Sequence, residues 1–378
     1  ARKYRTLDSR VVLSWCRPPE SSRKSEDLFL PNVRRLTGVS PMTAPEVGVL
    51  LTGEGMSLSR MVDYAISLED TGFQSVWHEE IFREPFVPLA AIAARTKSIR
   101  LGAAVSTWSR TPVTSALTAA NLDQLSHGRY VHGVGTGPPA WNEQYHGISY
   151  EHPVQRMREF IEVIRSVWRA HSGQAVSYGG HWYNVRDYSR PLRQEREAIT
   201  LALAAVQRNM LRLAGSHADA VIFNVLTTKE YYRDYGLRYL AEGAGSAGRP
   251  VTDVERLALI CVAVHEDVAQ AREWARHQIA FFAVIPYFDA ILGIHGFAKE
   301  TAAIRGAATE GDLHRQIGAV SDEMVDRLTI AGTPAECRAR LAEWVDIDTA
   351  LLVSPTFGLG DEEIAANYQA IRDAFARR

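Results

Sequence analysis

The sequence predicts an α/β fold in which eight parallel strands close into a (β/α)8 TIM barrel. Short apolar runs alternate with helical patterns along almost the whole chain, and eight strand–helix units can be counted in order. Continuous apolar runs are typical of parallel strands that are buried on both faces. The stretch GVLLTGEGMS, which covers the first strand and its loop, lacks the G-x-G-x-x-G fingerprint of an open dinucleotide-binding sheet. Strict alternation therefore favours the closed barrel.

Each element follows from a local pattern. Ser57 is placed to cap the first helix and Gly72 to end it. Pro88, Pro112 and Pro153 mark the starts of later helices, where proline is tolerated. The predicted strands are 47–51, 75–77, 100–105, 130–134, 199–204, 220–224, 257–264 and 349–354. The predicted helices are 57–71, 88–96, 111–125, 154–168, 209–214, 229–241, 267–282 and 362–376. Residues 176–178 and 181–183 predict a small β-hairpin.

Two stretches depart from this alternation. Residues 1–44 are rich in Arg, Lys, Ser and Pro, and we expect a loosely ordered extension in which Met42 is a candidate start. Residues 45–378 then form the barrel. Residues from about 284 to 325 are excess sequence between the seventh and eighth strands. Their apolar string VIPYFDAILGIHGF predicts a lid or partner surface over the barrel mouth.

Composition argues against several classes of function. The 42 basic and 44 acidic residues leave a net charge of −2, so neither a nucleic acid nor an anionic membrane is an expected partner. Cys16, Cys261 and Cys337 are far apart, which predicts no disulfide framework and a cytoplasmic location. No apolar run approaches the ~20 residues of a membrane span. The 12 histidines form no H-x-H or H-E-x-x-H cluster, so no metal is expected, and no G-x-S-x-G elbow predicts a hydrolase.

Polar and small residues gather where the second, third and fourth strands end. These residues are Glu79, Glu80, Ser106, Thr107, Thr136 and Gly137. Because the carboxyl ends of barrel strands meet at one face, we expect them to form one pocket. A carboxylate beside apolar walls can donate or accept a proton, although a pair of solvated loop acids fits the same sequence.

Other stretches suit a flat, phosphorylated ligand. Small residues at 103–107 let a ring approach the backbone, and the glycines of 133–137 allow the same on the next strand. Residues 204–210 join the fifth strand to a helix, whose exposed N–H groups and Arg208 suit a phosphate. Ordinary barrel packing and an ordinary capped helix fit these stretches equally well. The residues alone therefore predict a barrel enzyme with an apolar, aromatic pocket.

Several strings together resemble the bacterial-luciferase-like oxidoreductase superfamily. They are SVWHEEIFREPFVPLAAIAARTKSIRLGAAV, SRTP, LDQLSHGRYVHGVGTG, HPVQRMREFIEVIRSVW and NMLRLAGSHADAVIFN, and the match covers most of residues 47–375. The resemblance implies a (β/α)8 barrel with an insertion before the last strand, in agreement with the count of units. It also implies an oxidoreductase that uses either reduced FMN and oxygen, or the deazaflavin coenzyme F-420 for hydride transfer. EPFVPLAAIAARTKSIRLGAAV followed by SRTPVTSA looks more like the deazaflavin branch.

The resemblance also implies roles for individual residues. A cis peptide between Ala104 and Val105 is expected behind the cofactor ring, and Gln207, Arg208 and Asn209 are expected at its phosphate. The residues expected to border the ring are Ser106, Thr107, Thr136 and Gly137. The residues expected to line the substrate pocket are Trp108, Trp141, Tyr145, His146, Tyr287 and Phe288.

Glu80 is the expected proton relay for hydride transfer, with His146 or Glu143 as alternatives. Many deazaflavin relatives have Asp-His after the second strand, where this chain has Glu80 and Ile81, so the histidine that contacts the ring is missing. Pro138 stands where sugar-phosphate members carry a glutamate, which disfavours a glucose phosphate. We therefore expect the substrate to be some other small organic molecule. The resemblance also implies a homodimer, because members of the superfamily are commonly dimers. An FMN-dependent monooxygenase and a cofactor-free binding protein are the alternatives.

Overall fold

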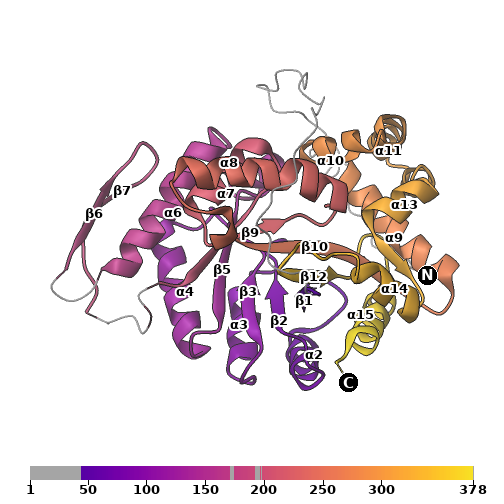
Figure 1. Ribbon diagram of the computed structural model, residues 1–378, viewed down its shortest axis with the longest axis horizontal. Coiled ribbons are helices and arrows are strands. Elements are labelled where there is room, and N and C mark those ends of the chain that lie inside the picture. The colour runs from indigo at the N-terminus through magenta and orange to yellow at the C-terminus, as the bar shows by residue number, and fades with distance from the viewer. Residues whose placement is uncertain (1–43, 171–173, 192–195, 197, 378) are drawn as a thin grey trace.

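Eight parallel strands form the centre of the molecule (Figure 1). The computed structural model describes residues 44–170, 174–191, 196 and 198–377, so the predicted extension lies outside the described residues except for its last residue. Each strand pairs with the next, and β12 pairs with β1 to close the ring. The strands are β1 Glu46–Leu51, β2 Ser75–His78, β3 Arg100–Ala103, β5 Tyr130–Gly135, β8 Thr200–Ala204, β9 Ala220–Phe223, β10 Glu255–Val264 and β12 Thr349–Val353. The predicted (β/α)8 TIM barrel is confirmed.

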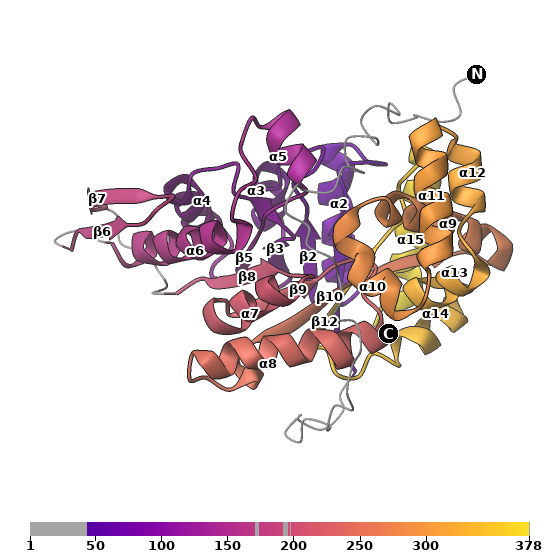
Figure 2. The ribbon, with the colours of Figure 1, turned by 90° about the horizontal axis from the view of Figure 1, so that it is seen from above.

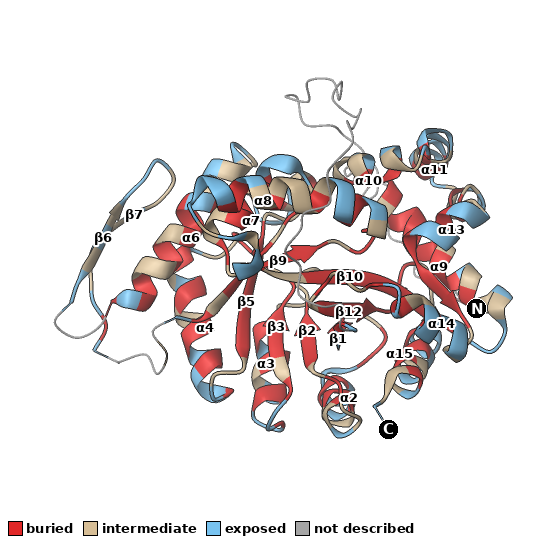
Figure 3. Ribbon diagram, viewed as in Figure 1, coloured by how far each residue is buried: buried red, intermediate tan, exposed pale blue. Residues whose placement is uncertain are grey.

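Helices surround the ring, with their buried faces toward the strands and their exposed faces outward (Figure 3). They are α2 Leu58–Asp70, α3 Phe86–Ala93, α4 Pro112–Leu125, α6 Pro153–Arg169, α7 Arg208–His217, α8 Leu237–Ser246, α9 Val268–Ala283 and α15 Asp361–Phe375. A π-helical turn, η1 Tyr231–Gly236, precedes α8, and a 3-10 turn, η2 Val251–Asp253, follows it. In α6, Met157, Phe160 and Ile164 recur at helical spacing and are fully buried, which attaches this helix to the barrel.

The Trp77 side chain of β2 packs over Gly102 of the neighbouring strand β3. This side chain is fully buried, and a Cβ atom added at Gly102 of the paired strand would lie only 2.1 Å from the indole Cε3. Glycine at position 102 is therefore required by the close approach of the ring rather than by backbone conformation. Removing a buried indole of this kind typically costs about 3–5 kcal/mol.

The chain between β10 and β12 adds several short helices on one side of the barrel (Figure 2). They are η3 Pro286–Phe288, α10 Asp289–Ile294, α11 Ala298–Glu310, α12 Leu313–Gly318, α13 Asp322–Leu328 and α14 Pro334–Leu341. A short strand, β11 Ile330–Gly332, lies before α14 and pairs in parallel with the end of β10. Within the described residues, no single helix is long and apolar enough to cross a membrane; Val268–Ala283 and Pro286–Ile294 pass that test only as a pair bent by 105°.

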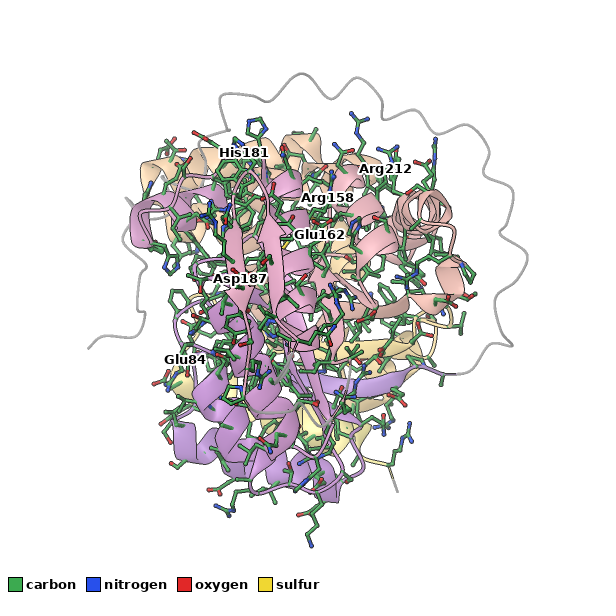
Figure 4. All side chains as sticks on the ribbon, turned by 90° about the vertical axis from the view of Figure 1, so that its left-hand side faces the viewer. Glu84, Arg158, Glu162, His181, Asp187 and Arg212 are labelled. Carbon is green, nitrogen blue, oxygen red and sulfur yellow. The ribbon has the colours of Figure 1, made fainter. Side chains whose placement is uncertain are left out.

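Two local structures differ from the expectations. Between the predicted strand 130–134 and the predicted helix 154–168, where no element was predicted, the chain forms a short helix, α5 Pro139–Tyr145. The hairpin strands are β6 Val176–Gly179 and β7 Asn184–Tyr188, so the second begins after the predicted 181–183. The reason is Glu159 of α6, whose carboxylate accepts hydrogen bonds from the backbone N–H groups of residues 181, 182 and 183 and holds them in the turn. Figure 4 looks onto this hairpin, with His181 labelled at its turn and Asp187 on its second strand.

Candidate active site

One cavity of about 1700 Å³ opens at the carboxyl ends of the barrel strands. Its walls come from the segments that follow β1, β2, β3, β5, β8, β9 and β12, together with the end of α9 and η3. Loops at this face of a parallel barrel are where catalytic groups converge. The cavity is thus the candidate active site, as expected from the residues at the strand ends.

Most of the residues predicted to bind a cofactor border this cavity. They are Ala104, Val105, Thr107, Thr136, Gly137, Gln207, Arg208 and Asn209. The peptide between Ala104 and Val105 is cis, as predicted, and a two-residue strand, β4 Ser106–Thr107, follows it. Ser106 is the exception, because its side chain is fully buried behind the wall and donates a hydrogen bond to Glu80.

Small residues bring two backbones together at this wall. A Cβ atom at Gly135 would lie 2.6 Å from Val105 Cγ2, and one at Gly133 would lie 1.9 Å from the Ala103 carbonyl oxygen. A larger residue at either of these two positions would push β5 away from β3 and β4. The result is a surface made largely of backbone and methyl groups, which suits the face of a flat ring.

Glu80 is held firmly inside this wall. Its carboxylate accepts hydrogen bonds from the Thr107 backbone N–H at 2.7 Å and from the hydroxyls of Ser106 and Thr107 at 3.2 and 3.4 Å. Arg110 completes the set with an ion pair of 3.1 Å, and the Glu80 side chain is only 13% exposed. The Glu80 N–H also donates to the Val105 carbonyl at 3.1 Å. These contacts make Glu80 the connection between the end of β2 and the residues around the cis peptide.

Glu79 has a different environment, although it also borders the cavity. Among the described residues, no hydrogen-bond donor reaches its carboxylate, whereas Glu80 has several. Burial, followed by the negative charge of Glu54, raises the pKa of Glu79 to about 8. Arg83 donates hydrogen bonds to the carbonyls of Gly53 and Met56, which fixes the loop that carries Glu54. At neutral pH the Glu79 carboxyl is therefore largely protonated.

The first turn of α7 lies at the cavity and carries the residues predicted to meet a phosphate. Gln207 is the N-cap, and its side chain makes no capping hydrogen bond; the amide instead donates to the Tyr287 carbonyl at 2.8 Å. Tyr235 of η1 accepts from the Arg208 N–H at 3.3 Å. Gln207, Arg208, Asn209 and Met210 line the same cavity as the cis peptide. A phosphate at the helix start is favoured by the helix dipole, so these residues fit a phosphorylated cofactor.

The predicted aromatic wall is only partly present. Trp141 and Tyr287 border the cavity. Trp108 does not, because its indole N–H bonds Asn142 and its ring packs 5.5 Å from that of Tyr150, with Arg156 over its face.

Three more predicted pocket residues also lie away from the cavity wall. Tyr145 and His146 are exposed on α5 and just after it, and Tyr145 is 52% exposed. Phe288 is fully buried against Phe282. The prediction that Trp108, Tyr145, His146 and Phe288 line the pocket is therefore corrected, because none of them borders the cavity.

Three residues that the strand-end pattern did not single out also border the cavity. They are Glu54, Tyr150 and Asn224. Tyr150 donates to the Thr136 hydroxyl at 3.0 Å. Asn224 hydrogen-bonds the Tyr287 side chain, and burial raises the pKa of Tyr287 so that its hydroxyl stays protonated. The position of Asn224 directly after β9 is a signal that the strand-end argument would have found in the sixth unit.

Comparisons with known proteins agree with this geometry. The sequence model of a family described as luciferase-like monooxygenase matches residues 38–349. The chain is 30% identical over 300 residues to the 5,10-methylenetetrahydromethanopterin reductase of Methanolobus tindarius, across 78% of this chain and 89% of that relative.

Two solved structures share the fold. The coenzyme F-420-dependent tetrahydromethanopterin reductase of Methanopyrus kandleri aligns with a TM-score of 0.73 at 23% identity, covering 87% of this chain and 98% of that one. The oxygenating constituent of 3,6-diketocamphane monooxygenase from Pseudomonas putida, in complex with FMN, aligns with a TM-score of 0.64 at 17% identity, covering 89% and 98%. Both contain the same kind of barrel.

Proposed function

This chain belongs to the luciferase-like monooxygenase family and is an oxidoreductase, and on that premise we propose that it transfers hydride between coenzyme F-420 and a small organic substrate. The main support is that one cavity contains both a backbone-lined wall for a flat ring and a helix N-terminus for a phosphate. The reductase from Methanolobus tindarius and the F-420-dependent structure from Methanopyrus kandleri support the choice of a deazaflavin.

The residues divide into three roles in this proposal. Ala104 and Val105, with Thr136 and Gly137 opposite, receive the ring, and the first turn of α7 receives the phosphate. Glu80 orients the ring wall through its bond to the Thr107 N–H rather than acting on the substrate. The bound deazaflavin supplies or accepts hydride; the chain's own groups position the partners, exclude water and move the accompanying proton.

An FMN-dependent monooxygenase is the second candidate. The FMN-bound neighbour from Pseudomonas putida favours it, because the same ring wall and phosphate turn suit both cofactors. The absence of a histidine at position 81 also removes a feature that many deazaflavin relatives carry. What favours hydride transfer over oxygenation is Glu79, since hydride reduction of a polar bond consumes a proton that a neutral carboxyl can provide.

Binding titrations distinguish these functions. Oxidised coenzyme F-420 and FMN are titrated separately into the protein, and quenching of cofactor fluorescence gives each dissociation constant. We expect coenzyme F-420 to bind at least about tenfold more tightly than FMN, a difference of about 1.4 kcal/mol. The reverse preference would favour the monooxygenase. Binding of neither, by protein whose circular dichroism shows a folded barrel, would favour a cofactor-free binding protein.

A further inference from the structure

We propose that Glu79 is the acid that protonates the substrate during hydride transfer, and that the substrate therefore carries a polarised C=O or C=N bond on a largely apolar body. This inference rests on the proposed function and deepens it. The geometry that carries it is the position of Glu79 at the end of β2, on the cavity wall beside Glu54 and next to the ring wall around Val105.

The groups around Glu79 keep it neutral rather than paired. Glu54, on the loop after β1, is the charge that acts on its carboxyl, and it opposes ionisation. Tyr287 of η3 and Tyr368 of α15 face it with hydroxyls that stay protonated, because burial raises the pKa of each. The nearby Arg83 guanidinium is engaged by two carbonyls of the β1 loop. A carboxyl in such surroundings retains its proton at neutral pH and can donate it.

Glu80 cannot take this role without losing its structural one. Three hydrogen-bond donors and the Arg110 guanidinium already occupy its two oxygens. Turning the Glu80 carboxylate toward a substrate would break the ion pair with Arg110 and the hydrogen bond from the Thr107 N–H. The two neighbouring glutamates therefore have different roles: Glu80 supports the ring wall, and Glu79 is the acid on the cavity wall.

The proposed step balances in atoms and electrons. Reduced coenzyme F-420, when bound, would supply a hydride, that is one hydrogen with an electron pair, as its own C–H bond breaks and the coenzyme is oxidised, and a C–H bond would form at the substrate carbon. The π pair of C=O or C=N moves to the heteroatom as that bond is reduced. The Glu79 O–H bond breaks, its proton forms the new O–H or N–H bond, and the carboxylate that remains regains a proton from water. The product is an alcohol or an amine.

The inner wall of the cavity indicates the rest of the substrate. It is formed by apolar side chains from β10, from α9, from the residue before η3, from the end of β12 and from the segment that follows β12. They include Leu259, Phe281, Phe282, Ile285, Val353 and Phe357. An apolar inner wall together with the Glu79 acid favours a substrate with a largely apolar body and a hydrogen-bond acceptor at the reacting bond. A charge placed against this inner wall would lose its hydration without gaining a partner there.

The first test measures the protonation of the Glu79 carboxyl directly, in the protein without cofactor. Infrared spectra of wild type and Glu79→Gln are recorded from about pH 4 to about pH 10, and their difference isolates the Glu79 carboxyl. We expect its protonated band to persist through neutral pH. The same difference measured in a Glu54→Gln background should titrate at least about one pH unit lower, because a like charge is gone. Glu266→Gln, at an exposed position after β10, is the matched control and should change nothing.

The second test uses chemical probes with reduced coenzyme F-420. Cyclohexanone and 1-pyrroline present C=O and C=N bonds, and cyclohexene presents an isolated C=C bond of similar size. We expect turnover of the first two but not of the third. Glu79→Gln should lower kcat/KM at least about 100-fold while coenzyme affinity stays within about twofold. Reduction of cyclohexene alone would overturn the substrate class.

The two proposals fail in different ways. If coenzyme F-420 does not bind, the proposed function falls, and the infrared titration still reports on Glu79. If coenzyme F-420 binds but Glu79 is fully ionised by about pH 6, this inference falls and the proposed function stands. If coenzyme F-420 binds but neither cyclohexanone nor 1-pyrroline is reduced, the substrate class proposed here is wrong. Melting curves of both glutamine variants check that each is folded.

Discussion

The Glu80 carboxylate accepts a hydrogen bond from the Thr107 backbone N–H at 2.7 Å. This contact joins the end of β2 to the chain just after the cis peptide, so the second and third units of the barrel hold the ring wall together. Glu80→Ala removes the acceptor for several donors and leaves the partly buried Arg110 without this partner. We expect a loss of about 2–4 kcal/mol in the free energy of unfolding and a coenzyme dissociation constant raised about tenfold. Urea denaturation and fluorescence titration measure the two effects.

The control for this prediction is Glu84→Gln. Glu84 contacts the same arginine at 3.4 Å but is 38% exposed, and the single amide oxygen of glutamine can still accept from one of the two N–H groups at the start of α3. Its effect on stability should stay below about 1 kcal/mol. Unchanged coenzyme binding in Glu80→Ala would show that the wall does not need this contact.

Protonation of Glu79 gives stability a distinctive pH dependence. Its folded pKa of about 8 lies above its ordinary value of 4.5. As pH rises through this window, the unfolded chain gives up the proton first, so ionisation favours unfolding and stability falls. Glu79→Gln cannot ionise and should lack this fall. Between about pH 5 and about pH 8, the free energy of unfolding of the variant should therefore rise relative to that of wild type by up to about 1.4 kcal/mol per pH unit. Urea denaturation at several pH values measures this difference. Parallel pH profiles for the two proteins would contradict the raised pKa.

The opposite end of the barrel offers a test of stability that spares the site. Arg100 at the start of β3 and Glu255 at the start of β10 form a two-point ion pair of 2.5 and 2.7 Å between strands on opposite sides of the ring. Arg100→Met leaves a partly buried carboxylate without its partner, and we expect a loss of about 1–3 kcal/mol. Adding Glu255→Met should restore part of the lost free energy of unfolding, because no unpaired carboxylate then remains. Coenzyme affinity should not change in either protein; a tenfold loss would mean that the two ends are coupled.

Arg208 should matter for the phosphate of the cofactor and not for its ring. Arg208→Ala is expected to raise the dissociation constant of coenzyme F-420 about tenfold at low salt, and by less at high salt, because salt screens the interaction. The deazaflavin chromophore that lacks the phosphate should bind wild type and variant equally. Fluorescence titrations with both molecules at two salt concentrations measure this difference. If the variant bound both molecules more weakly by the same factor, Arg208 would lie at the ring instead.

Much of the barrel is visible in the sequence because buried parallel strands are continuous apolar runs with helical stretches between them. The structure starts and ends these strands within a few residues of the predicted positions, as in β5 and β12. β11 was missed because three residues, Ile330–Gly332, are too short for a period to be recognised. The turn of the hairpin was misplaced because Glu159, on a distant helix, decides where the strand begins.

The site shows the same division between local pattern and tertiary contact. The residues at the strand ends, except Ser106, do meet in one cavity, since barrel topology brings them to one face. Which of Glu79 and Glu80 faces a ligand depends on the Thr107 N–H, and no local pattern in HEE encodes that contact. The family resemblance implied that Trp108 lines the pocket, but its indole N–H donates to Asn142, 34 positions away, and the ring does not border the cavity.

A crystal structure with oxidised coenzyme F-420 tests the central claim most directly. The account predicts that the deazaflavin ring lies against the Ala104–Val105 peptide, between it and the strand end at Thr136. It also predicts that the phosphate meets the first turn of α7 beside Arg208. A cofactor bound outside this cavity, or a ring turned away from Val105 with its phosphate far from α7, would contradict the account.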